Sequence, residues 1–317
     1  MDATIIIATY NEENYIEECI RTLEEQSYDR ARYQIFIIDG NSTDKTTELV
    51  RGLMKEYSNI KIFNNPKRIQ AAAFNIGIEN SDTEYSFVVG AHATYDSDFI
   101  KNSIESIREN NVDCVGGKVI FDAKTSIGKY YALARGTLFG GGVSSYRYSN
   151  KKQLVDTASF GCYKTSVLRE VGGYNEELVK NQDNDINKRI IANGGKILFD
   201  PIIKFTYFTR DSYPAIRKQM YNYGYWEAKV IQQDKKQFSI FTIVPSLFVI
   251  YNILALILLI KTPIFIMLSM IPYLILYLVF YFKYAFGKNP FELLVIYLTI
   301  HCGIGVGFIR GMFKNKK

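Results

Sequence analysis

The sequence contains very little histidine and cysteine. Its 317 residues include two histidines, His92 and His301, which are too few for a histidine-based metal cluster. The four cysteines are scattered and form no Cys-x-x-Cys pair, which excludes a zinc ribbon and a disulfide scaffold and fits a reducing compartment. Apolar residues still make up 48% of the chain, with 24 Tyr and 21 Phe, so a substantial core is expected.

Acidic residues are almost absent from the C-terminal quarter of the chain. Residues 238–317 hold seven Lys or Arg and one acid, Glu292, so the whole net charge of +6 falls in this tail. The rest of the chain is balanced. This argues against nucleic-acid binding, because that function needs a concentrated basic face on the folded domain.

Three apolar runs predict a membrane domain at 231–317, after a first domain at 1–230. Residues 238–260 and 262–282 are free of charge over 23 and 21 positions, compared with the ~20 residues that cross a bilayer as a helix. The third segment, about 291–309, contains His301 and three glycines, and both a crossing and a re-entrant helix fit it. No signal peptide pattern precedes the first strand, so we expect a multi-pass cell-membrane protein whose first domain is cytoplasmic.

The first 110 residues alternate between short apolar runs and helical patterns. Strands are expected at 4–8, 34–38, 60–63 and 85–89, and helices at 14–26, 44–57, 69–79 and 98–109. Strands that are apolar on both faces and joined by helices predict an α/β fold with a mostly parallel, Rossmann-like sheet. Ligands of such sheets bind beyond the carboxyl ends of the strands, and polar segments follow the strands there, at 9–12, 39–44, 64–68 and 90–92.

Several segments, taken in order, resemble glycosyltransferase family 2. They read I-I-I-A-T-Y-N-E at 5–12, I-I-D-G-N-S-T-D-K-T at 37–46, N-P-K-R at 65–68, V-G-G-Y-N-E at 171–176 and Q-D-N-D at 182–185. Within the family the chain is most similar to membrane-attached enzymes of succinoglycan-type exopolysaccharide synthesis, through G-A-H-A at 90–93 and D-T-A-S-F-G at 156–161. The resemblance implies a glycosyltransferase type A fold followed by transmembrane helices, and inverting transfer from a nucleoside diphosphate sugar.

Inverting transfer needs a carboxylate that takes the proton of the attacking acceptor hydroxyl. The resemblance assigns this general base to Asp183, with Asp185 as the reserve candidate. Gln182 stands where the family has another acid. The alternative for both aspartates is capping of the helix that follows them, because acids favour the start of a helix.

The resemblance also implies a set of donor-binding residues. Asp39 is expected to bind the nucleotide base, although a turn role is an alternative, and Asp44 is expected to cap the next helix. The other implied donor-binding residues are Thr9, Tyr10, Glu12, Lys67, Arg68, Ala91, Arg210 and Arg217. An exposed pair of loop charges is the alternative for Lys67 and Arg68.

In most of the family an Asp-x-Asp at the end of the fourth strand holds a divalent metal, Mn²⁺ or Mg²⁺, that neutralises the leaving diphosphate. Gly90 removes the first carboxylate here, so we expect weakened metal binding or a metal held by His92 and the donor phosphates. A metal-independent site stays open. The literal Asp-x-Asp at 96–98 precedes a helix, and we expect it to cap that helix.

Acceptor binding is expected at Asp156 and Trp226. The alternatives are a buried structural role for Asp156 and an amphipathic helix at the membrane surface around Trp226. The predicted function is transfer of a sugar to a lipid-linked saccharide in surface polysaccharide synthesis. Transfer to a polyprenyl phosphate, or a relative that binds the donor without turnover, are the alternatives.

Overall fold

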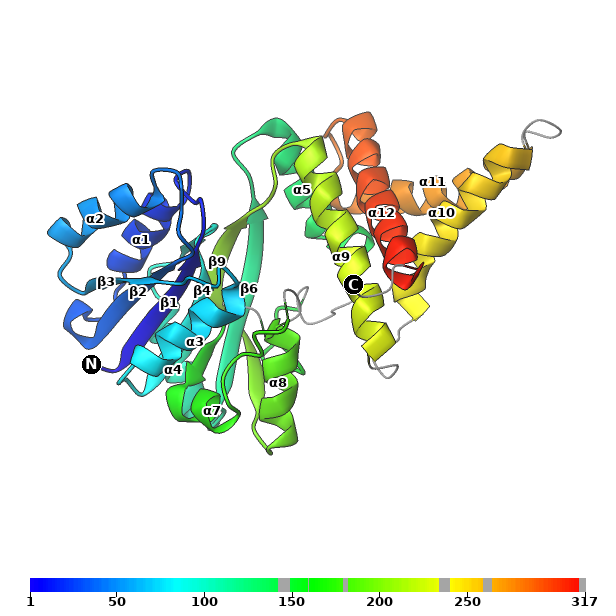
Figure 1. The fold of residues 1–317 in the computed structure, drawn as a ribbon. Helices are drawn as coiled ribbons and strands as arrows, with labels where there is room; N and C mark the ends of the chain where they lie inside the picture. The colour runs from blue at the N-terminus through cyan, green and yellow to red at the C-terminus, as the bar shows by residue number, and fades with distance from the viewer. Residues whose placement is uncertain (142–148, 159, 179–181, 234–239, 259–263, 314–317) are drawn as a thin grey trace. The chain divides into compact units, whose positions relative to one another are not determined.

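The protein divides into two compact units (Figure 1). The computed structural model describes the chain except for residues 142–148, 159, 179–181, 234–239, 259–263 and 314–317. The first unit contains Met1–Ile120 and Tyr146–Tyr207, and the second contains Phe121–Ser145 and Phe208–Lys317. This division differs from the predicted boundary at residue 230, because the chain contributes a segment to the second unit near its middle and then returns to the first.

Four parallel strands form one half of the sheet of the first unit. They run in the order β3-β2-β1-β4, with bounds β1 (Ala3–Thr9), β2 (Tyr33–Asp39), β3 (Ile60–Asn64) and β4 (Tyr85–Gly90). The helices between them are α1 (Ile16–Glu24), α2 (Thr46–Glu56) and α3 (Gln70–Asn80). β1 and β2 are buried along nearly their whole length, as isoleucine-rich strands covered on both faces should be. These predicted elements are confirmed.

The other half of the sheet is antiparallel, so the sheet is mixed rather than mostly parallel. Its strands are β5 (Ala93–Tyr95), β6 (Cys114–Asp122), β7 (Gln153–Leu154), β8 (Cys162–Lys164) and β9 (Ile197–Phe208). β8 pairs antiparallel with β4 and β6, while β5 and β7 pair antiparallel with β9. In the described part of the chain this completes the path β3-β2-β1-β4-β8-β6-β9-β5. The partners of these strands lie far away in the sequence, so the local residue pattern of each strand did not predict it.

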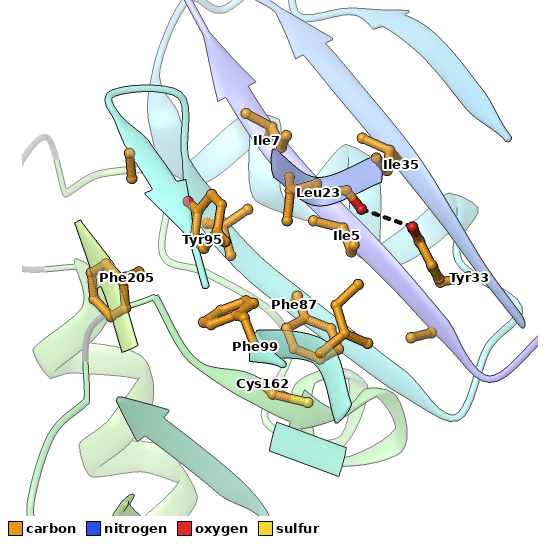
Figure 2. Close-up of a cluster of buried hydrophobic side chains, with 14 of the residues drawn as sticks. Ile5, Ile7, Leu23, Tyr33, Ile35, Phe87, Tyr95, Phe99, Cys162 and Phe205 are labelled. Atoms are coloured by element: carbon orange, nitrogen blue, oxygen red, sulfur yellow. Dashed lines mark hydrogen bonds between the residues drawn. The ribbon is translucent and has the colours of Figure 1, made fainter. Parts of the chain in front are cut away.

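Apolar side chains cover both faces of the sheet. One face packs against α1, α2 and α4 (Phe99–Asn110), in the cluster that Figure 2 shows around residues such as Phe87 and Phe99. The other face packs against α3, α7 (Thr165–Glu170) and α8 (Gln182–Ala192). α3 lies so close to β1 that a β-carbon at Gly77 would overlap the side chain of Ile6. Because both faces are filled, the edges formed by the strand ends are left for ligands.

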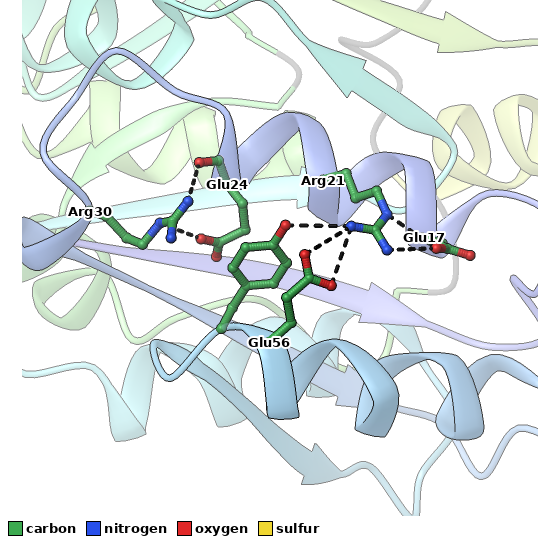
Figure 3. A network of polar contacts seen from close by, with 6 residues as sticks. Glu17, Arg21, Glu24, Arg30 and Glu56 are labelled. Atoms are coloured by element: carbon green, nitrogen blue, oxygen red, sulfur yellow. Dashed lines mark hydrogen bonds and ion pairs between the residues drawn. The ribbon is translucent and has the colours of Figure 1, made fainter.

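The carboxylate of Glu24 is buried at the end of α1 (Figure 3). The side chain of Glu24 is fully buried, and its Oε2 lies 2.9 Å from Nε of Arg30, in the short helix η1 (Arg30–Arg32). Burial raises the pKa of Glu24 above its ordinary value of 4.5, and the nearby charge of Glu56 adds to this, although Arg30 offsets part of the shift. The exposed carboxylate of Glu56 differs, since hydrogen bonds from Tyr57 and Arg21 lower its pKa.

The two carboxylates should therefore give opposite dependences of stability on pH. A pKa that is higher in the folded state means that Glu24 contributes stability below pH 4.5, which is lost as the pH rises through the folded-state pKa. We expect Glu24→Gln to raise the melting temperature relative to wild type at pH 7 and to lose this advantage near pH 4. The control Glu56→Gln should lower the melting temperature at pH 7. The pKa of Glu56 is lowered in the folded state, so its carboxylate contributes stability at pH values above its ordinary pKa of 4.5. Melting curves between pH 4 and pH 8 test both, and a lower melting temperature for Glu24→Gln at pH 7 would contradict the assignment.

The second unit is helical. Its helices are α5 (Ser126–Arg135), α6 (Leu138–Gly141), α9 (Tyr213–Gln233), α10 (Ile240–Leu258), α11 (Ile264–Tyr284) and α12 (Pro290–Phe313). α9 and α12 pack at very short range. A β-carbon at Gly224 would overlap the carbonyl oxygen of Ile304, and one at Gly307 would overlap that of Tyr221. Such contact between backbones is possible only where side chains are absent.

One helix in the described residues is long and apolar enough to cross a bilayer, and it is α12. The charge-free runs gave the first two segments the strongest signal, and α10 and α11 lie in these segments. The predicted spans 238–260 and 262–282 reach into residues 238–239, 259–260 and 262–263, outside the described residues, so these two spans stay a prediction. For the third segment, a continuous helix of 24 residues is found.

Candidate active site

Four residues in left-handed backbone conformations mark one edge of the sheet. Asn11 follows β1, Asn41 follows β2, Arg68 follows β3, and Phe160 precedes β8 beside the end of β4, with φ between 51° and 59°. Asparagine tolerates this conformation, whereas it strains arginine and phenylalanine by an amount of order 1–3 kcal/mol. Backbone strain of this kind clusters at functional sites, so the carboxyl edge of the parallel strands is the candidate active site.

Asp39 ends β2 and holds the turn that follows it. Its Oδ2 accepts from the amide of Ser42 at 2.9 Å, and its Oδ1 accepts from the Ser42 hydroxyl at 2.6 Å and from the Thr9 hydroxyl at 3.3 Å. Thr9 is its neighbour in register on β1. The turn role considered for Asp39 is therefore present, and the buried carboxylate is fixed in orientation at the strand end. Ser42 was not predicted as a site residue.

Asp44 lies two residues before the first residue of α2, and Lys45 rather than Asp44 occupies the N-cap position. Its carboxylate accepts from the amide of Thr46 at 3.0 Å and from the amide of Glu13 at 3.1 Å. Partial burial acts to raise the pKa of Asp44, but these hydrogen bonds outweigh it and lower that pKa below its ordinary value. Tyr10 is exposed in the turn after β1 and makes no described contact with Asp44.

Glu12 and His92 come together from the ends of β1 and β4. Glu12 Oε2 lies 2.8 Å from His92 Nε2, and both side chains are mostly buried. The His92 ring packs on the Tyr15 ring, with centroids 4.0 Å apart, and Ala91 beside it is buried. Sequence analysis gave Glu12 a role in donor binding and His92 a role as a metal ligand. In the structure the two side chains are in direct contact.

The Glu12–His92 pair fits part of a divalent metal site. Two ligands bound to adjacent positions of one ion at about 2.1 Å lie about 3 Å apart, close to the separation of Glu12 Oε2 and His92 Nε2. The buried Glu12 Oε2 accepts no hydrogen bond from the described residues. No group of three His, Cys, Asp or Glu side chains that could hold a metal is found in the described part of the chain. The protein thus offers two donors at this edge, with Gly90 supplying none.

Lys67 and Arg68 separate in the loop after β3. Lys67 pairs with Glu176, which also accepts from Asn75 at 3.0 Å, so Lys67 ties this loop to the Gly-Gly turn before Glu176. Arg68 is exposed, and its backbone has the left-handed conformation. The Arg68 amide donates to the backbone oxygen of the buried Asn65 at 3.2 Å, which holds this turn. Both side chains are exposed, as the alternative of exposed loop charges expects, and Lys67 has Glu176 as its ion-pair partner.

α8 begins beside the same edge of the sheet. Gln182, its first residue, donates from Nε2 to Gln70 Oε1 at 3.0 Å, which joins α8 to the start of α3. Asp183 follows, partly exposed. Burial raises the pKa of Tyr174, and the charge of Asp183 raises it further, so this carboxylate lies close to the buried phenol. Asp185 instead pairs with Arg189 through Oδ2, at 3.0 Å and 2.7 Å.

The segment before β8 is fastened to α8 by a residue that the sequence did not single out. Asn187 is fully buried and donates to the Thr157 hydroxyl and to the Ala158 carbonyl, both at 3.1 Å, while Tyr163 donates to its Oδ1 at 3.2 Å. Asp156, just before this segment, is exposed, so the alternative of a buried structural aspartate is wrong. A polar residue four positions after Asp183 in a helix was the available signal for Asn187.

The literal Asp-x-Asp at 96–98 follows β5 on the exposed surface. Asp98 occupies the N-cap position of α4 but makes no side-chain capping bond, and its Oδ1 accepts from the hydroxyl of Ser27 at 2.5 Å instead. The capping prediction therefore holds for its position and fails for its hydrogen bond. The short strand β5 between His92 and Asp96 was not predicted.

The remaining predicted residues belong to the second unit. Arg210 is partly buried before α9, and Arg217 is exposed on α9. Trp226, also on α9, packs edge-on against Tyr225 with ring centroids 5.6 Å apart. Their roles in donor and acceptor binding stay predictions.

Comparison with known proteins identifies the family of the chain. Residues 4–172 match the sequence model of glycosyl transferase family 2. A dolichyl N-acetyl-alpha-D-glucosaminyl phosphate 3-beta-D-2,3-diacetamido-2,3-dideoxy-beta-D-glucuronosyltransferase of Methanococcus voltae is 32% identical, over 98% of this chain and 97% of its own. The succinoglycan biosynthesis protein ExoA of Rhizobium meliloti is 27% identical, over 71% of this chain and 68% of its own. The chain therefore belongs to glycosyltransferase family 2.

Solved structures share the fold. The mannosyltransferase PcManGT from Pyrobaculum calidifontis, in complex with GDP-Man and Mn²⁺, aligns with a TM-score of 0.69 at 16% identity, over 98% of this chain and 87% of that one. S. aureus TarS in complex with UDP aligns with a TM-score of 0.51 at 18% identity, over 68% of this chain and 64% of that one. The fold is of the glycosyltransferase type A, and with its family this makes the protein a nucleotide-sugar glycosyltransferase.

Proposed function

We propose that this glycosyltransferase inverts the anomeric centre as it moves a sugar from a nucleoside diphosphate to a lipid-linked saccharide in surface polysaccharide synthesis. The observation that carries this proposal is the gathering of a fixed carboxylate, an imidazole–carboxylate pair and the start of α8 at one edge of the sheet. Asp39 and Thr9 at the ends of β2 and β1 offer hydrogen-bonding groups for a nucleotide base. Tyr10 and Arg68 border the same edge.

Asp183 is proposed as the general base. Its carboxylate would accept the proton of the acceptor hydroxyl while that oxygen forms a bond to the anomeric carbon and the bond to the diphosphate breaks. Asp183 is partly exposed and stands at the start of α8. Asp185 forms an ion pair with Arg189, which counts against Asp185 as the base.

Glu12 and His92 are proposed to hold a divalent metal together with the donor phosphates. A bound metal ion would neutralise the charge that develops on the leaving diphosphate. A carboxylate oxygen with an imidazole nitrogen suits Mn²⁺ better than Mg²⁺, which prefers oxygen ligands. The chain's own part is to fix these two donors, through the Tyr15 ring under His92 and the bond from the Glu12 amide to the Thr46 hydroxyl at 2.7 Å.

The acceptor is proposed to be lipid-linked, and the second unit to bind the membrane. The names of the two relatives support this, since one modifies a dolichyl phosphate sugar and the other serves succinoglycan synthesis. Large apolar side chains are exposed along α10 and α11, which in water would form an unusually large apolar surface. We therefore propose several membrane helices, a cytoplasmic first unit, and acceptor contacts by Asp156 and Trp226, with Arg210 and Arg217 near the donor.

A screen of nucleotide sugars tests the proposal. The full chain in detergent would be assayed for hydrolysis and for transfer to a lipid-linked saccharide, with and without Mn²⁺. We expect turnover of at least one UDP- or GDP-linked sugar, stimulated by Mn²⁺, and we expect His92→Ala to lose both the stimulation and the binding of Mn²⁺ measured by electron paramagnetic resonance. No binding of any nucleotide sugar by the wild type would overturn the proposed function.

A further inference from the structure

Gly90, the last residue of β4, lies directly against the ring of Phe160. A β-carbon at Gly90 would lie 2.6 Å from Cζ and 2.8 Å from Cε1 of that ring, which is closer than atoms can approach. Any side chain at position 90 therefore requires the ring to move. Glycine at this strand end is explained by the close approach of the ring.

The ring of Phe160 is held in place by a strained backbone conformation. Phe160 has φ 51°, in the left-handed region that side chains rarely adopt. The chain is fixed on both sides of it, because the Val88 amide donates to the Gly161 carbonyl at 2.9 Å and Asn187 donates to the Ala158 carbonyl at 3.1 Å. The ring packs beside Phe205 and Tyr207, with centroids 5.0 Å and 6.0 Å away, and stays partly exposed.

The strand order places this ring between the two ends of the proposed site. Along the edge, Asp39 ends β2, Thr9 ends β1, Gly90 ends β4, and Phe160 precedes β8. Asp183 stands at the start of α8, which is joined to β8 by the hydrogen bond from Tyr163 to Asn187 Oδ1 at 3.2 Å. A donor whose base is at Asp39 and whose anomeric carbon faces Asp183 must pass its sugar over β4 and the start of β8.

We propose that the exposed part of the Phe160 ring is the surface on which the donor sugar packs, and that Gly90 is needed to seat this ring. The inference rests on the proposed function. An aromatic ring presents a flat face with negative charge density, which attracts the C–H groups on one face of a pyranose. Phe160 would thus select donors whose sugar has such an apolar face, while the nucleoside diphosphate is bound elsewhere.

Two single substitutions test this assignment. Phe160→Leu keeps an apolar side chain but removes the flat ring, and Gly90→Ala displaces the ring. Both variants of the full chain, in detergent, would be titrated with UDP and GDP and with the corresponding hexose-linked nucleotides. We expect each to bind the nucleotide sugar about three- to tenfold more weakly and the free nucleoside diphosphate as wild type does. Equal losses for both ligands, or no loss for either, would overturn the proposal.

A double substitution shows whether Gly90 acts through the ring. If it does, Gly90→Ala should cost little additional affinity for the nucleotide sugar in the Phe160→Leu background, because the ring is already gone. An undiminished cost there would refute the role given to Gly90. Asn111→Gly is the matched control, since Asn111 is also left-handed but caps α4 away from this edge, and it should leave all affinities unchanged. If the wild type binds neither UDP nor GDP, the proposed function fails first and this inference fails with it.

Discussion

Replacing Asp183 with asparagine should abolish sugar transfer and leave donor binding intact. Asparagine has nearly the same shape but cannot accept the proton of the acceptor hydroxyl at neutral pH. Loss of a general base lowers rates by about 10²- to 10⁴-fold. The measurement is the initial rate of transfer to the lipid-linked acceptor, beside titration of the same protein with the nucleotide sugar. The prediction requires the rate to fall by this factor while the dissociation constant for the nucleotide sugar stays within about twofold of wild type, a difference of about 0.4 kcal/mol.

Asp185→Asn is the matched control, two positions further along α8. Asp185 pairs with Arg189, and Arg189 also donates to the Gly173 carbonyl at 2.8 Å, so the pair braces the Gly-Gly turn against α8. Both side chains are about one-third exposed, so loss of this ion pair should cost no more than about 1 kcal/mol of stability. We expect a lower melting temperature and a small loss of rate. If Asp185→Asn loses transfer and Asp183→Asn keeps it, the base is Asp185 and the assignment is wrong.

The parallel half of the fold could be read from the sequence, and the antiparallel half could not. β1, β2 and β4 are short apolar runs joined by helices, and that local pattern is sufficient to predict them. β8 has three residues and takes its place only through pairing with β4 and β6, on either side. β9 begins with apolar residues but contains Pro201, which weakens its strand signal. Pairing between strands that lie far apart in the sequence does not show in the local pattern of either strand.

The candidate site was predictable where it follows a parallel strand. Asp39, Glu12 and His92 were found because the carboxyl ends of such strands meet at one edge. The contact between Glu12 and His92 was not predicted, since it depends on which way each side chain turns. Phe160 and Asn187 were missed for another reason. Their roles arise from a strained backbone and from bonds to distant segments, and single-residue chemistry does not indicate either one.

Glycines in the third apolar segment make a contact that hydrophobicity does not indicate. The third segment has the shortest charge-free run, yet α12 is the helix that meets the criteria for a bilayer span in the described residues. Its glycines, which left a re-entrant helix open as an alternative, include Gly303, Gly307 and Gly311 in contact with α9. Burial of apolar side chains gives helices little reason to associate in an apolar solvent, so close packing of their backbones stabilises the contact instead. Small residues in such a helix therefore indicate an interface.

Gly307→Ala should therefore destabilise the second unit strongly. The new β-carbon would overlap the carbonyl oxygen of Tyr221, which belongs to the backbone of α9 and cannot rotate away. The helices must separate, and overpacking of this kind costs about 1–3 kcal/mol. We expect the melting temperature of the full chain in detergent to fall by about 3–10 °C. Gly224→Ala should act in the same way, because its β-carbon would meet the Ile304 carbonyl from the opposite helix.

Gly52→Ala is the control for a glycine in a helix without such a contact. Gly52 lies in α2 of the first unit, is exposed, and has no atom within 4 Å of its added β-carbon. Alanine there should stabilise by about 0.5–1 kcal/mol, because glycine loses more backbone freedom on folding. Opposite signs for Gly52→Ala and Gly307→Ala would show that contact between the two helices, and not helix propensity, requires glycine in α12. A stabilising Gly307→Ala would mean that α9 and α12 do not approach at this position in the folded protein.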